Sequence, residues 1–164
     1  MRGLLVLFPI LAGILLGPWP ARAEVAGLVG RWAAETPSGP IELQVEPAGR
    51  GTAVRLTRSG RALFDASFGP TDRPGVLEAT ATGLFAILGS RRAPANPLEG
   101  EELLWAREAG AALIVSRLAI DAGRPSIERA QLLRAGERVR LRLERLVGER
   151  MVVELEAELA RTGR

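Results

Sequence analysis

The sequence predicts an all-β protein, built as a single antiparallel meander of about 8–10 strands that closes into a small β-barrel. Apolar and charged residues alternate through residues 137–161, which is the period of a half-buried antiparallel strand. Turn-forming clusters recur about every 8–12 residues, a spacing typical of sandwiches and barrels. No long segment has the period of an amphipathic helix. Barrel closure is expected because it removes the edges that so many strands would otherwise expose.

The composition indicates one globular domain with little net charge. The chain has 164 residues, of which 47% are hydrophobic and 25% charged. All 22 basic residues are arginines, so few groups titrate near neutral pH and the sequence pI of about 11.0 overstates the positive charge. Without Arg2 and Arg22 of the predicted leader, 20 arginines face 19 acidic residues, a formal charge of +1. We expect no nucleic-acid partner, which would need clustered positive charge.

Residues 1–23 have the three parts of a secretory signal peptide. The positive start Met1-Arg2 precedes an apolar run, and Ala21-Arg22-Ala23 places small residues where signal peptidase cleaves. The alternative is a membrane anchor, but a span needs about 20 apolar residues and this run is shorter and contains a proline. We expect cleavage after Ala23 and a single barrel domain over residues 24–164, periplasmic or secreted in a bacterium and not membrane-spanning.

The first strands of the domain follow from alternation and turn chemistry. Residues 41–46 alternate between apolar and polar side chains, and two further strands are expected before residue 69. Arg58-Ser59-Gly60 fits a three-residue hairpin loop, because a final glycine tolerates the left-handed conformation required there. This loop would place Leu56 opposite Ala62, so that the apolar faces of the two strands match.

The middle of the chain contains further strands and the longest irregular segment. Strands are expected at residues 76–82, 102–108, 111–121 and 126–134. Residues 83–89 are continuously apolar, which fits either a buried strand or a turn of helix. Residues 90–100 contain two prolines and one asparagine and are expected to form a long loop.

The last two strands are expected to form a charged hairpin around Val147-Gly148-Glu149. In that register three arginines face three glutamates on the solvent side: Arg142 and Glu154, Arg140 and Glu156, and Arg138 and Glu158. Each exposed pair would contribute about 0.2–1 kcal/mol. We interpret these charges as a solvated face that sets the register, not as a binding surface.

The residue types that are absent exclude most catalytic chemistry. Without His, Cys, Lys or Tyr there is no Ser–His–Asp triad, Schiff base, or imidazole or thiolate metal ligand. A carboxylate pair would suffice for glycoside hydrolysis. However, the three aspartates, Asp65, Asp72 and Asp121, lie at turns or on an exposed strand face. We therefore expect no enzymatic activity, no catalytic residue, no metal and no cofactor.

Four residues on adjacent strands are candidates for ligand contact: Trp105, Ser116, Arg117 and Glu128. If even-numbered side chains point inward, Ser116 and Glu128 enter the interior beside Leu118, where a buried Glu needs a partner that a ligand could supply. The alternative is that these residues are hydrated near a barrel mouth and that Trp105 is a core or rim aromatic. The pattern alone does not decide which face of these strands points inward.

Gly30-Arg31-Trp32, at the first strand after an export signal, resembles the G-x-W entry of lipocalins. A single-domain exported meander of this size is also similar to the wider calycin group of small β-barrels. The resemblance implies that Trp32 closes the narrow end of the barrel, packed under an arginine from a late strand. It also implies ligand binding inside the barrel.

Two functions are compatible with these features of the sequence. The first is a module that binds a small apolar molecule or lipid in the periplasm, with an internal cavity lined by residues such as Leu56, Phe64, Phe68 and Leu118. The second is a structural or interaction protein that associates with another envelope protein through a surface patch or the loop at residues 90–100.

Overall fold

The computed structural model describes residues 25–82 and 96–163, which form an all-β barrel of ten antiparallel strands. The strands are β1 (Gly30–Ala34), β2 (Ile41–Ala48), β3 (Gly51–Arg58), β4 (Arg61–Pro70), β5 (Val76–Thr82), β6 (Leu103–Ala109), β7 (Ala112–Asp121), β8 (Arg124–Ala135), β9 (Arg138–Val147) and β10 (Arg150–Arg161). A 3-10 helix, η1 (Pro97–Glu99), precedes β6. The predicted fold class is confirmed.

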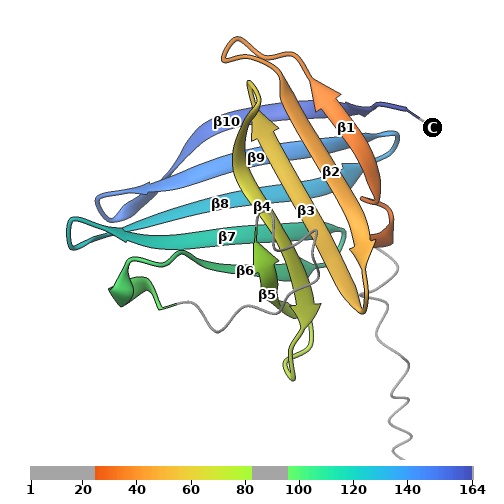
Figure 1. Ribbon diagram of the computed structural model, residues 1–164. Helices are drawn as coiled ribbons and strands as arrows, with labels where there is room; N and C mark the ends of the chain where they lie inside the picture. Colours follow the sequence, from red (N-terminus) through yellow and green to blue (C-terminus); the bar gives the residue numbers. More distant parts are fainter. Residues whose placement is uncertain (1–24, 83–95, 164) are drawn as a thin grey trace, which may run out of the picture.

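Each strand pairs with its neighbours in the chain, and β1 pairs with β10 to close the barrel. Trp32 lies opposite Arg161 in this last ladder. Figure 1 shows β2, β3 and β4 crossing β7 to β10 at a steep angle, and the β7–β8 and β9–β10 hairpins extending beyond the other strands on one side. The barrel is therefore longer along one wall than along the other.

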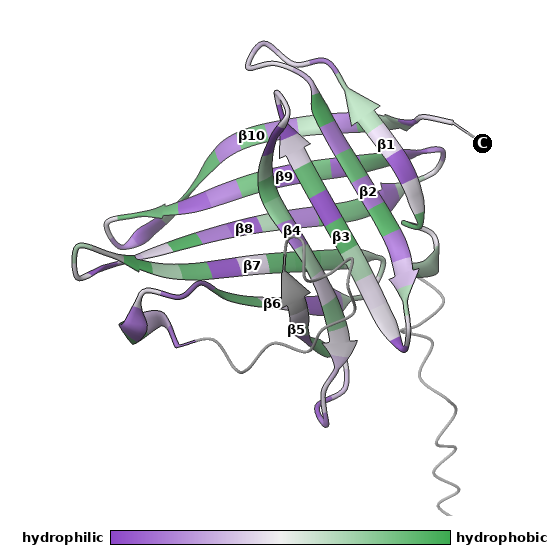
Figure 2. Cartoon of the chain, in the orientation of Figure 1, coloured by the Kyte–Doolittle hydropathy of each residue, from purple (hydrophilic) through white to green (hydrophobic). Residues whose placement is uncertain are grey.

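Alternation of side chains assigns an inner and an outer face to every strand. Apolar and polar residues alternate along most of β9 and β10, as the stripes of Figure 2 show. The inner side chains form one contiguous core, whose largest fully buried members include Trp32, Phe68, Leu28, Ile41, Leu43, Leu56, Leu113, Leu132, Leu141 and Leu159. The core fills the middle of the barrel.

The predicted register of the β3–β4 hairpin is wrong. The loop has two residues, Ser59 and Gly60, whose φ angles of 51° and 77° match the twist of the flanking strands. Leu56 lies opposite Phe64, not Ala62, because a bulge at Leu63 adds one residue to β4. In the observed register Ala62 points to the outside of the barrel, where it is exposed.

The predicted register of the β9–β10 hairpin is also wrong, by two residues. The loop is Gly148-Glu149, and a bulge between Val153 and Leu155 places the extra residue Glu154 in β10. Arg140 therefore lies opposite Glu158 and Arg142 opposite Glu156. A shift of two residues keeps every side chain on its face, so the predicted opposition of basic and acidic stripes is retained with different partners.

Trp32 lies at one end of the barrel, where it is only 1% exposed. Its indole Nε1 donates a hydrogen bond of 2.8 Å to the carbonyl oxygen of Leu28, in the helical turn that precedes β1. The guanidinium groups of Arg134 and Arg161 lie 4.7 and 5.3 Å from the centre of its ring. Trp32 thus packs beneath arginines of two late strands, and the end of the barrel where it lies is called the closed end below.

Two features of the structure require a glycine at position 30, two residues before Trp32. The φ of Gly30 is +140°, a conformation that side chains rarely adopt. A Cβ there would lie 3.1 Å from Nη2 of Arg161, and this nitrogen donates a hydrogen bond of 3.2 Å to the carbonyl oxygen of Val29. The glycine therefore lets the last strand's arginine reach across β1 to Trp32.

Three predictions fall on residues outside the described ranges: the leader at residues 1–23, the apolar run at residues 83–89 and most of the loop at residues 90–100. The end of that loop is η1, where Asn96 accepts a hydrogen bond from the backbone nitrogen of Leu98. Within the described part of the chain, no helix has the length and hydropathy needed to cross a membrane.

Candidate functional site

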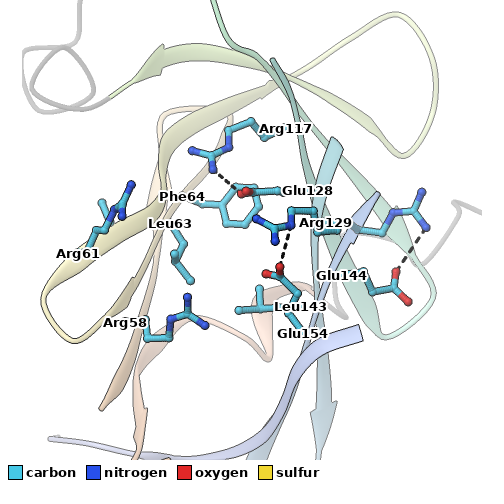
Figure 3. A pocket seen from close by; sticks show the side chains of 12 residues that line it. Arg58, Arg61, Leu63, Phe64, Arg117, Glu128, Arg129, Leu143, Glu144 and Glu154 are labelled. Atoms are coloured by element: carbon cyan, nitrogen blue, oxygen red, sulfur yellow. Dashed lines mark hydrogen bonds and ion pairs between the residues drawn. The ribbon is translucent and has the colours of Figure 1, made fainter. Parts of the chain in front are cut away.

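The strongest candidate site is a cavity of about 560 Å³ at the barrel end opposite Trp32, called the mouth below. Figure 3 shows it from close by. Six strands supply its lining, which consists of Arg58, Arg61, Ala62, Leu63, Phe64, Arg117, Glu128, Arg129, Leu143, Glu144, Arg145 and Glu154. The mouth therefore lies between the β3–β4 hairpin and the wall made by β7 to β10.

Strand alternation directs Arg117 and Glu128 into the mouth. On β7 the core residues are Leu113 and Val115, so Arg117 points inward. On β8 the core residue Ala130 places Glu128 on the inner face. Arg117 and Glu128 are direct cross-strand partners, and their side chains form an ion pair. The two charges meet inside the barrel instead of projecting into solvent.

Arg117 makes three contacts that hold it in the wall of the mouth. It pairs with Glu128, its Nη1 lies 3.6 Å from Oε1 of Glu102, and its guanidinium carbon lies 5.7 Å from the centre of the Phe64 ring. The side chains of Arg117 and Glu128 are 24% and 26% exposed. This partial burial strengthens their attraction relative to that of a fully exposed pair.

A second ion pair lies beside the first one. Nε of Arg145 is 2.8 Å from Oε1 of Glu154, the residue that the β10 bulge adds. Arg129 and Glu144 also pair, at 3.7 Å. They alternate with the core residues Ala130 and Leu143, so their side chains point to the outside of the barrel wall.

Two further arginines complete the rim of the mouth. Arg58 and Arg61 flank the turn of the β3–β4 hairpin and lie directly opposite each other. Arg58 also lies opposite the core residue Ile41 in β2, which places both arginines on the inner face. In the described ranges, neither forms an ion pair. The inward charges of the lining are thus Arg58, Arg61, Arg117 and Arg145 against Glu128 and Glu154. Glu102, beside Arg117, lowers the excess of positive charge at the mouth to one.

The floor of the mouth is apolar and continues into the core. Phe64 is 2% exposed and Leu143 6% exposed, and the half-buried Leu63 packs against the core cluster. Figure 3 shows Leu63 and Phe64 between the two arginines of the β3–β4 hairpin and the ion pairs of the opposite wall. The mouth thus combines an apolar floor with a charged rim, and charged residues make up most of its lining.

The expected ligand cavity differs in place from the observed one. Leu56 and Phe68 are 1% exposed and belong to the packed core, and only Phe64 of the expected residues lines the mouth. Leu118 is on the outer face of β7, two residues beyond Ser116. The expectation that Leu118 lines an interior cavity is therefore wrong.

The structure separates the four predicted ligand residues into two pairs. Arg117 and Glu128 line the mouth, whereas Trp105 and Ser116 are cross-strand partners on the outer face and do not line it. The turn between β7 and β8 has two residues, so each even-numbered residue of β7 lies opposite an odd-numbered residue of β8. Cross-strand partners share a face, and even-numbered side chains therefore point inward on β8 but outward on β7. Ser116 is nevertheless buried, at 3% exposure.

The sequence-based candidates do not include four of the inward charged residues of the mouth: Arg58, Arg61, Arg145 and Glu154. Arg145 and Glu154 are brought together by the bulge in β10, which leaves no mark in the alternation. Arg58 and Arg61 carried a usable signal. A two-residue loop at Ser59-Gly60 would have placed them opposite each other, and Ser-Gly is among the dipeptides that mark a turn.

In residues 25–82 and 96–163, no group of three or more acidic side chains is arranged to hold a metal ion. Comparison with known proteins finds no family model, no curated protein and no solved structure that matches this chain.

Proposed function

We propose that this chain is an exported binding protein that holds one small, largely apolar molecule in the mouth of its barrel. The observation that carries the proposal is the cavity of about 560 Å³ with an apolar floor and a charged rim. Its volume lies within the range of about 300–1,000 Å³ that is usual for ligand pockets. The floor residues Leu63 and Phe64 would contact the apolar part of the ligand.

The proposal is a binding function and not a catalytic one. The inward carboxylates of the mouth are engaged by guanidinium groups, Glu128 by Arg117 and Glu154 by Arg145. A carboxylate in such a pair is poorly placed to exchange a proton with a substrate. The chain also has no His or Cys with which the mouth could form a nucleophile–base pair.

Export and the kind of barrel are parts of the same proposal. Residues 1–23 have the composition of a signal peptide, which supports a periplasmic or secreted protein. The closed meander and the stacking of Arg134 on Trp32 support a lipocalin-like barrel. In such a barrel one end is plugged and the other admits the ligand, which agrees with a filled core below an open mouth.

The test is retention and binding of an apolar molecule. Native mass spectrometry of the exported protein, purified without detergent, should show a bound small molecule in addition to the mass of the chain. Titration with the neutral fluorophore N-phenyl-1-naphthylamine should give saturable binding. Leu63→Trp, which fills the mouth, should weaken this binding about tenfold or more, a loss of about 1.4 kcal/mol.

Leu98→Trp is the matched control, because Leu98 is 84% exposed on η1 and does not line the mouth. It should bind the fluorophore as the unmodified chain does. If the unmodified protein shows no saturable binding, or if both variants bind equally well, the mouth is not a ligand site.

A second candidate function is association with another protein of the cell envelope. Val147, Val152 and Val153, near the end of the β9–β10 hairpin, are 56%, 45% and 39% exposed. Val147 and Val152 share one face of the hairpin and Val153 lies on the other. Exposed apolar side chains that gather on one face are a feature of contact surfaces. A photo-crosslinking residue at Val152 should then give a discrete adduct in intact cells, whereas one at Arg142 should not. Equal labelling at both positions would contradict this function.

A further inference from the structure

We propose that the ligand of the mouth is an amphipathic anion, whose charged group is bound by Arg58 and Arg61. This ligand class rests on the proposed binding function and makes it more specific. A ligand of this class would place a carboxylate or similar oxyanion at the rim of the mouth and an apolar body on its floor.

The fold leaves positive charge unmatched on one side of the rim. Arg117 and Arg145 each have a carboxylate partner inside the mouth, at Glu128 and Glu154. Arg58 and Arg61 have none among the described residues, although both line the cavity. A partly enclosed cavity concentrates the field of such charges. The unpaired charges of Arg58 and Arg61 therefore favour an anion at this side of the rim.

The cross-strand pairing of Arg58 with Arg61 departs from the rest of the sheet. Elsewhere in the described strands, arginines that face a charged residue across a ladder face an acid, as Arg117 faces Glu128 and Arg142 faces Glu156. Like charges directly opposite each other destabilise a sheet. Two arginines at facing positions therefore destabilise this hairpin, and an anion between them would relieve their repulsion.

The donors of the two arginines have a geometry that suits an oxyanion. Each guanidinium presents a planar set of N–H groups that can bind an oxyanion in a bidentate manner. Leu63 and Phe64 follow Arg61 in β4, so an apolar floor begins next to the two charges. One molecule can thus contact the arginines with its head group and the floor with its body (Figure 3).

The experiment compares ligands that differ only in the head group. Dodecanoate, dodecanol and acetate are tested for displacement of N-phenyl-1-naphthylamine from the exported protein. Dodecanoate should compete at least about tenfold better than dodecanol, because hydrogen bonds to charged groups are stronger than those between neutral groups. Acetate, which has no body for the floor, should not compete at the same concentrations.

The double variant Arg58→Gln/Arg61→Gln should lose the preference for dodecanoate and keep its affinity for dodecanol. Arg124→Gln/Arg150→Gln is the matched control. It removes the same charge from the β7–β8 and β9–β10 hairpins, next to their turns, and neither residue lines the mouth. The control should retain the preference. Circular dichroism verifies that both variants are folded.

The outcomes separate the ligand class from the function on which it rests. If dodecanoate and dodecanol bind equally, or if the preference survives in the Arg58/Arg61 variant, the anionic head group is refuted while the binding function stands. Competition by acetate as strong as that by dodecanoate would refute the amphipathic ligand. If the fluorophore itself does not bind, the proposed function fails and the ligand class fails with it.

Discussion

An arginine lies over an aromatic ring at both ends of the barrel, but the surroundings of this contact differ between the two ends. At the closed end, guanidinium groups stack on Trp32, which is 1% exposed. At the mouth, Arg117 lies over Phe64 but also pairs with Glu128 and Glu102, and solvent reaches it. The arginine–aromatic contact is therefore not what distinguishes a site. Solvent access and unmatched charge are what make the mouth the candidate.

The difference has a physical cause. Stacking on an aromatic face stabilises a cation by about 0.5–2 kcal/mol, and at the closed end it covers the indole whose Nε1 is already satisfied by Leu28. The ring of Trp32 itself is therefore not accessible to a ligand. At the mouth the β7–β8 and β9–β10 hairpins extend beyond the other strands, and the inner side chains of Arg117 and Glu128 line the cavity and remain partly exposed.

The largest expected effect is at the closed end. Trp32→Ala should lower the free energy of unfolding by about 3–5 kcal/mol, because it removes a buried aromatic and leaves a cavity in the core. Trp105→Ala is the control, since Trp105 lies half-buried on the outer face. Urea denaturation measures both. A loss for Trp32→Ala no greater than that for Trp105→Ala would contradict the structural role assigned to Trp32.

An intermediate effect is expected at the mouth. Arg117→Met leaves the carboxylate of Glu128, 26% exposed, without its partner, and should cost about 1–3 kcal/mol of unfolding free energy. Glu128→Gln combined with Arg117→Met should cost less than the sum of the single changes, by about 0.5–3 kcal/mol. Denaturation of the four proteins of this cycle gives the coupling. Additive losses would show that the two side chains do not interact.

The smallest effect is expected on the outer wall. Arg140 and Glu158 are 59% and 53% exposed, with Nη2 and Oε1 3.6 Å apart. Arg140→Ala should change the free energy of unfolding by no more than about 0.5 kcal/mol after allowance for solvent screening. The change should disappear at about 1 M salt, where the Debye length is about 3 Å. A larger or salt-independent loss would mean that this surface pair is structurally as important as the mouth pair.

Period-two alternation was sufficient to predict the fold class, because it depends only on which residues prefer water. It did not determine the registers. Shifting β10 by two residues relative to β9 leaves every side chain on the same face of the sheet. The alternation of the sequence is therefore equally compatible with Glu154 and with Glu156 as the cross-strand partner of Arg142, and the structure has Glu156. The bulges at Leu63 and Glu154 cannot be recognised from the residue types of the strands, and only the cross-strand pairing reveals them.

The sequence by itself determined the alternating strands, the absence of imidazole and thiol chemistry, and the candidates Arg117, Glu128 and Trp32. These conclusions follow from residue types and their spacing. Only the tertiary structure decided that Arg117 and Glu128 share one inner face, because the parity of a cross-strand pair depends on the length of the turn that joins the strands. It also brought Arg58 and Arg61 to the rim of the mouth, since only barrel closure places the β3–β4 hairpin opposite the β7–β10 wall.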